Sequence, residues 1–206
     1  MSACVIIVLR RFRPRPTYPS VIYRQMKLIL TVIFTLTFCI PAFSQTLTNA
    51  DLTRRIKERH AEKNISLTFN AAGNTTTVRG VSENFPSAES KHAGILAMNF
   101  AVGFYFPGNE LSQSPDKLLL SFWVLTKKPR FGESNALNAG AASFGKARYA
   151  YKDRMDMEYL NFELRPEELS KMAAAGKIKI GSETFTLTLE QRGLLADILA
   201  IIRTND

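Results

Sequence analysis

The sequence predicts an α+β fold, a mostly antiparallel curved sheet or β-sandwich of about eight strands. One helix is expected at the N-terminal side of the strands and two helices in the C-terminal part. Apolar side chains alternate with a period of two through much of residues 64–164, which is typical of strands. Near both ends of this region the period becomes helical and is accompanied by helix-capping residues.

The first helix is predicted over residues 48–63. Thr48, with Asp51 three residues later, is a variant of the capping-box start. Leu52, Ile56 and His60 share one narrow stripe, and most of the other positions are charged. We therefore expect a mostly solvated helix that packs one narrow face against the rest of the domain.

The strands follow. Residues 64–82 predict a hairpin, because two β-rich runs flank Gly73 and Asn74, which suit a tight turn. Residues 95–106 predict one long strand with a bulky apolar face and a face of smaller side chains. The bulky face comprises Leu96, Met98, Phe100, Val102, Phe104 and Phe106. Residues 116–128 alternate similarly, as in a central strand, and two more strands are predicted over 142–153 and 157–164.

The C-terminal part predicts a helix, a short hairpin and a second helix. Pro166 suits the first turn of a helix, and Gly176 is expected to end it. A hairpin is predicted to turn at Gly181, and Thr188 with Gln191 forms a capping box for the last helix. The apolar stripe of that helix comprises Leu195, Ile198, Leu199 and Ile202.

Residues 157–202 combine a strand, the run LRPEELSKMAAA, the run KIKIGSETFTLT and a helix. In this order the segment resembles the C-terminal half of certain uncharacterised exported bacterial proteins. It spans about a quarter of residues 45–206. The resemblance implies a bacterial envelope setting, and it supplies no catalytic residues.

Residues 26–44 predict a signal peptide. Lys27 is followed by an apolar run from Leu28 to Ile40, and small residues occupy Ala42 and Ser44, so cleavage is expected between Ser44 and Gln45. The run of 13 apolar residues is too short for a spanning helix, which needs about 20, so we expect no transmembrane anchor after cleavage. Residues 1–25 are interpreted as a disordered extension upstream of the true start. Residues 45–206 are expected to form a single exported domain, periplasmic or secreted.

Removal of residues 1–44 changes the charge of the protein. The full chain has 27 basic and 18 acidic residues, but six of the basic residues and none of the acidic ones lie in 1–44. The remaining 21 basic residues leave a net charge of +3, and no specific nucleic-acid signature is present. Cys4 and Cys39 would also be removed, so the domain is expected to fold without disulfides.

Serine hydrolysis and metal binding receive little support. Ser143 in AASFG approximates a nucleophile elbow, but His60 and His92 both precede it and its surroundings predict antiparallel strands. Two histidines without a cysteine cannot form a structural zinc site. No cofactor is therefore predicted.

Carboxylate chemistry also lacks a motif. Asp153, Asp156 and Glu158 are interpreted as a charged turn between strands, with a calcium site as the alternative. A glycosidase would need two carboxylates facing each other across a cleft, and Glu110 with Asp156 illustrates a pair that the sequence alone cannot place.

Two surfaces remain as candidate binding sites. The first is a basic patch of Lys127, Lys128, Arg130, Lys146, Arg148 and Lys152, which would cluster if the strand 142–153 pairs with the preceding strand. Its partner would be an anionic macromolecule or lipid; the alternative is an ordinary solvated sheet face. The second is the bulky face of residues 95–106, which lines either a pocket for an apolar ligand or the core.

The molecular function is therefore not assigned by the sequence. The expected role is an exported envelope or secreted domain, non-enzymatic, that binds a partner or ligand through a sheet face or loops. The alternatives are a small exported hydrolase with an unrecognised site and a carrier of an apolar ligand.

We predict that the protein recovered from the exported fraction of its host begins at Gln45, because signal peptidase cleaves after small residues at the positions of Ala42 and Ser44. Intact-mass spectrometry with N-terminal sequencing measures this. Recovery of a chain that still begins at Met1 or Met26 would contradict the prediction.

Overall fold

The computed structural model of the chain describes residues 46–86 and 94–203. The predictions for residues 1–25 and for the signal peptide at 26–44 lie outside the described residues, as does His92. The described part confirms the predicted α+β class, with antiparallel sheets, one helix near its N-terminus and two helices near its C-terminus.

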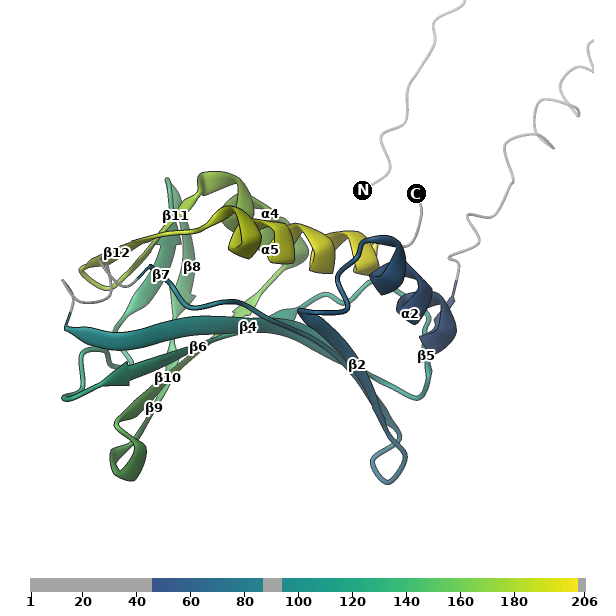
Figure 1. Ribbon diagram of the computed structural model, residues 1–206, viewed down its shortest axis with the longest axis horizontal. Helices are drawn as coiled ribbons and strands as arrows, with labels where there is room; N and C mark the ends of the chain where they lie inside the picture. Colours follow the sequence, from purple (N-terminus) through teal and green to yellow (C-terminus); the bar gives the residue numbers. More distant parts are fainter. Residues whose placement is uncertain (1–45, 87–93, 204–206) are drawn as a thin grey trace, which may run out of the picture. The chain divides into compact units, whose positions relative to one another are not determined.

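The largest sheet has six strands, in the order β2-β3-β4-β6-β10-β9, and every neighbouring pair is antiparallel. These strands are β2 (Ile65–Asn70), β3 (Thr75–Val81), β4 (Ile95–Pro107), β6 (Leu118–Thr126), β10 (Met157–Leu164) and β9 (Arg148–Lys152). The sheet is bent: β4 and β6 bow toward α4 and α5, and the turns of the β2–β3 and β9–β10 hairpins point the other way (Figure 1).

A second sheet has four strands, in the order β12 (Glu183–Thr186), β11 (Lys177–Ile180), β7 (Ala136–Ala139) and β8 (Ala142–Lys146). The pair β1 (Leu47–Thr48) and β5 (Glu110–Leu111) forms a third. The helices are α2 (Asn49–Glu58), α4 (Pro166–Ala175) and α5 (Leu189–Ile202), with a short turn η1 (Asp153–Met155). In the described ranges, no helix is long and apolar enough to cross a bilayer.

One core fills the space between the six-stranded sheet, the helices and the four-stranded sheet. Its centre is aromatic: the rings of Phe100 and Phe122 lie 5.8 Å apart, and Phe85 contacts Phe185 of β12 at 5.5 Å. Helix α5 packs closely on β3, because Gly80 has no Cβ that would meet Leu194. The phenylalanines of β4 are thus part of the core, which disfavours the alternative of a ligand pocket lined by this face.

The bulky face of β4 departs from the prediction at one residue. The alternation places Leu96 on the face of Met98, but its side chain is 53% exposed, whereas Ile95 is buried. The pairing register with β6 shifts between Ile95 and Ala97, which marks a β-bulge. A bulge adds one residue to a strand, so the residues on its far side face the opposite way from the one that a regular alternation predicts. Ile95 therefore enters the core in place of Leu96.

The predicted single strand over 142–153 is wrong. It is divided into β8, in the four-stranded sheet, and β9, in the six-stranded sheet. Gly145 has a φ of +88°, which bends the chain, and the N–H of the buried Ala147 donates to the carbonyl of Asn135. The division places Lys146 in one sheet and Arg148 in the other.

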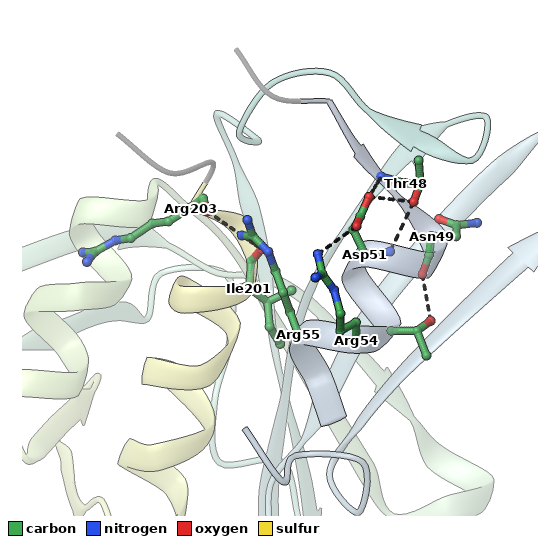
Figure 2. Close-up of polar contacts among 8 residues, drawn as sticks. Thr48, Asn49, Asp51, Arg54, Arg55, Ile201 and Arg203 are labelled. Atoms are coloured by element: carbon green, nitrogen blue, oxygen red, sulfur yellow. Dashed lines mark hydrogen bonds and ion pairs between the residues drawn. The ribbon is translucent and has the colours of Figure 1, made fainter. Parts of the chain in front are cut away.

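Helix α2 is hydrogen-bonded to the C-terminal end of α5 through Arg55. Nη1 of Arg55 donates to the carbonyls of Ile201 at 3.1 Å and Arg203 at 2.5 Å, where a helix leaves carbonyls without partners (Figure 2). Thr48 and Asp51 form the predicted capping box. The helix ends at Glu58, so His60, with a φ of +52°, is exposed and does not extend the predicted stripe.

We predict that Gly103→Ala lowers the free energy of unfolding by about 1–3 kcal/mol, the usual cost of overpacking. A Cβ at Gly103 would clash with the backbone oxygen of Val78, so one of the two strands must shift. Urea denaturation measures the change.

The matched control is Gly193→Ala. Gly193 lies inside α5, and a methyl group there would have no other atom within 4 Å, so alanine should stabilise the protein by about 0.5–1 kcal/mol. A neutral Gly103→Ala would contradict the close approach of β3 and β4.

Candidate functional site: the open face of the six-stranded sheet

The candidate site is the side of the six-stranded sheet that faces away from the core. We call it the open face; it consists of the odd-numbered residues 77–81 of β3, 97–105 of β4, 119–125 of β6 and 157–163 of β10, with the even-numbered residues of β9. Helices α4 and α5 lie on the opposite side of the sheet (Figure 1).

A shallow hollow lies near the middle of the open face. Its floor is formed by Ala101 and Gly103 of β4, and the larger side chains of Arg79, Leu119 and Trp123 surround it. The hollow holds about 220 Å³. Pockets that bury a drug-sized ligand usually measure about 300–1,000 Å³, so this hollow has room for one ring or substituent of a larger ligand.

The small side chains of β4 allow an arginine to cross the strand. Arg79 of β3 reaches over this part of β4 and places its guanidinium 4.7 Å from the ring centre of Trp123 on β6. A guanidinium stacked on an aromatic ring is held in one plane, and its N–H groups remain directed outward. Among the described residues, Arg79 forms no ion pair.

A second cation lies on a second ring of the same face. Nζ of Lys152 on β9 is 5.1 Å from the ring centre of Tyr159 on β10. Tyr159 is paired in register with Trp123, so the two rings occupy adjacent strands of one row. The polar side chains of Asn99, Ser121 and Asn161 lie around them. The centre of the open face thus combines aromatic rings, ring-bound cations and neutral hydrogen-bonding groups.

Further cations lie where β6 ends. Lys127, Lys128 and Arg130 are exposed in the loop after β6, next to Leu96, around a cleft of about 530 Å³. None of the three forms an ion pair within the described residues. Leu125 pairs with Met157, and Met157 with Lys152, so Lys152 lies at the same end of the sheet as this loop.

Glu158 fixes the position of the cationic loop. This carboxylate is completely buried on the core side of β10. It accepts hydrogen bonds from the backbone N–H groups of Arg130 at 2.9 Å and Phe131 at 2.8 Å, and from the hydroxyls of Thr126 and Tyr149, both at 3.1 Å. Four donors compensate the burial of the charge without a cation. Burial and the negative charge of Glu158 raise the pKa of Tyr149 to about 12.

The predicted basic patch is therefore only partly assembled. Lys127, Lys128, Arg130 and Lys152 lie at one end of the six-stranded sheet, but β10 separates β6 from β9, so the strand pairing on which the patch depended is wrong. Arg148 lies further along β9 and pairs with Glu163 at 2.7 Å. Lys146 belongs to β8 in the other sheet and does not join the cluster.

The acidic residues at this end do not form a metal site. All four hydrogen bonds to the Glu158 carboxylate come from protein donors, so Glu158 is not available to calcium. Asp153 and Asp156 are exposed in the turn between β9 and β10. In the described part of the chain, no group of three or more potential metal-binding residues converges.

The other predicted catalytic candidates lie apart. Ser143 is exposed on the antiparallel strand β8, which does not match a nucleophile elbow. Glu110 follows the C-terminal end of β4. Asp156 lies at the other end of that strand: its backbone carbonyl accepts from the N–H of Thr126, and Thr126 pairs with Ile95, the first residue of β4. The two carboxylates therefore lie beyond opposite ends of the 13-residue strand β4, whose length along the chain is roughly 40 Å, and this placement does not fit a glycosidase pair.

Sequence reasoning missed two features of the site, the pairing of Arg79 with Trp123 and the burial of Glu158. The first had a usable signal, since residues 97, 101 and 103 are small and would leave room over one face of the strand. The second had none, because nothing local distinguishes Glu158 from the exposed acids Asp153 and Asp156.

Comparison of the chain with known protein families, with curated proteins and with solved structures finds no match.

We predict that Glu158→Gln lowers the free energy of unfolding by about 1–3 kcal/mol. Both carboxylate oxygens accept a backbone N–H, so the NH₂ group of glutamine would leave one of these donors unpaired. The control is Glu163→Gln on the same strand, whose ion pairs with Lys117 and Arg148 are exposed to solvent, so its loss should be clearly the smaller of the two. Denaturant unfolding of both variants measures the difference, and equal losses would contradict a structural role for Glu158.

Proposed function

We propose that the chain is an exported, non-enzymatic binding domain that holds a stretch of acidic polysaccharide on its open face. The observation that carries the proposal is the pair of ring-bound cations, Arg79 on Trp123 and Lys152 on Tyr159, beside a shallow hollow. The expected signal peptide supports a place of action outside the cytoplasm, periplasmic or extracellular.

The charge of the surface favours an anionic ligand. The open face carries Arg79, Arg148 and Lys152 against a single acid, Glu163, which is already paired with Arg148 and Lys117. Lys127, Lys128 and Arg130 extend the positive charge beyond one end of the face, where Asp153 and Asp156 offset it only in part. The planar guanidinium of Arg79, positioned over the Trp123 ring, can bind a carboxylate or sulfate through two parallel hydrogen bonds.

The other side chains of the face favour a sugar polymer. The rings of Trp123 and Tyr159 offer apolar edges, and the amide of Asn99 can exchange hydrogen bonds with hydroxyl groups. Asn161 is already engaged, since its Oδ1 accepts from Ser121 at 2.6 Å and its Nδ2 donates to the carbonyl of Arg148 at 3.4 Å. The face lies between the turns of the β2–β3 and β9–β10 hairpins, which point away from the helices (Figure 1), and it spans the breadth of a six-stranded sheet, which suits an extended chain.

The geometry gives less support to the alternatives. A carrier of an apolar ligand needs an enclosed cavity, whereas the hollow is shallow and holds about 220 Å³. A hydrolase needs a carboxylate or other base free to act, and the one acid of the described open face, Glu163, is already held in ion pairs with Lys117 and Arg148.

We predict that the purified protein binds polygalacturonate, a polymer of carboxylated sugars, and that Arg79→Met weakens binding at least about tenfold, the loss expected from one charge-assisted contact of about 1.4 kcal/mol. Trp123→Ala should weaken it similarly, because it removes both the ring and the support of Arg79. Binding should fall with added salt. Isothermal titration calorimetry measures the affinities.

The control variant is Lys171→Met, which removes a cation from α4, away from the open face. Neutral dextran, a single-stranded oligonucleotide and vesicles of phosphatidylglycerol serve as alternative ligands. Failure to bind the acidic polysaccharide, or an affinity that Arg79→Met and Lys171→Met lower equally, would contradict the proposal. Tighter binding of the oligonucleotide or of the vesicles would assign the face to those ligands instead.

A further inference from the structure

We infer that β2 is the dimerisation edge of this protein, where a second copy of the chain adds its own β2 in antiparallel orientation. The inference is independent of what the open face binds. It rests on the hydrogen-bonding direction of β2, on its side chains and on the contrast between the two outer strands of the six-stranded sheet.

The backbone of β2 has hydrogen-bonding groups that point away from the sheet. Within residues 46–86 and 94–203, β2 is an end strand and is bonded to β3 on one side only. The N–H of Val81 donates to the carbonyl of Asn64, while the N–H of Ile65 donates to Ala61. In an antiparallel ladder the bonded residues alternate, so the even-numbered residues of β2 bond to β3, and Leu67 and Phe69 direct their N–H and C=O groups outward.

The side chains of this edge are apolar and uncharged. Phe69 is 45% exposed, and Leu67 is only partly buried against the core. No charged residue occurs between positions 64 and 78, so β2 and the turn after it lack the charges that usually protect an end strand from pairing. An exposed uncharged edge of this kind is a template for another strand.

The opposite end strand is protected. β9 carries Arg148 and Lys152, and Arg148 extends from the edge to Glu163. Two copies of β9 would bring these cations together. The six-stranded sheet therefore has one edge open to pairing and one guarded edge, which permits a closed dimer through this sheet and disfavours its endless extension.

The free groups define the register with a second copy. An antiparallel pair centred on Leu67 joins each Leu67 to its counterpart by two hydrogen bonds, and each Phe69 N–H to the free carbonyl of Ile65 across the axis. This register uses both outward groups of Leu67, the N–H of Phe69 and the free carbonyl of Ile65, and it leaves the carbonyl of Phe69 to solvent because the N–H of Ile65 already donates to Ala61. It also places Leu67 beside Leu67 and Phe69 beside Ile65, so that the exposed ring is covered.

Because β2 has only six residues, the contact is small and the dimer should depend on concentration. Sedimentation equilibrium of the purified protein over a wide concentration range should show a monomer–dimer equilibrium. Leu67→Lys and Leu67→Glu place like charges on the two-fold axis, and each should weaken dimerisation at least about tenfold. An equimolar mixture of the two variants should form a heterodimer, which also demonstrates that both are folded.

The control is Ala150→Lys on β9, an exposed position at the other edge of the same sheet, which should leave the dimer unchanged. A second measurement needs no mutation: the amides of Leu67 and Phe69 should become more protected from hydrogen exchange as the wild-type concentration rises. A wild-type protein that remains monomeric, a Leu67→Lys variant that dimerises like wild type, or a mixture that stays monomeric would overturn the inference. Protection of these amides only in a host extract would assign the edge to another protein and would likewise overturn it.

Discussion

The division of β4 into a bulky face and a small face is the constraint on which the rest of the domain depends. Its phenylalanines and methionine enter the core, where they meet β6, β10 and the hairpin β11–β12. Its alanines and Gly103 face the other way and are small enough for Arg79 to cross the strand and reach Trp123. A single pattern in one strand therefore creates both the interior and the hollow. Larger side chains at Ala101 and Gly103 would fill the hollow and prevent Arg79 from reaching the ring of Trp123.

A buried anion organises the cationic end of the same sheet. Glu158 receives four hydrogen bonds and so ties the loop after β6 to β10. The loop in turn displays Lys127, Lys128 and Arg130 to solvent. The interior charge is satisfied by neutral donors, which leaves the surface cations without a carboxylate of their own among the described residues. The proposed anionic ligand would complete this arrangement from outside.

The elements that were predictable are those specified by neighbouring residues. The hairpin β2–β3, the strands β4, β6 and β10, and the helices α4 and α5 follow from alternation, turn residues and capping boxes. The short strands β1, β5 and β7 were missed, because two to four residues carry little period; the equally short β11 and β12 were predicted only because Gly181 marks the turn between them. The division of β8 from β9 was missed because the alternation passes through Gly145 and Ala147 without interruption, while each half bonds to a different sheet.

The sequence by itself determined the local structure: where helices begin, where strands turn, and which face of β4 is bulky. Only the tertiary structure decided which strands are neighbours, and with that which side chains meet. The position of β10 between β6 and β9 divided the predicted basic patch. The position of β4 between β3 and β6 allowed the side chain of Arg79 to cross β4 and reach Trp123. The physical reason is that strand order is fixed by how the whole core packs, and packing between residues far apart in the chain leaves no periodic signal in either segment.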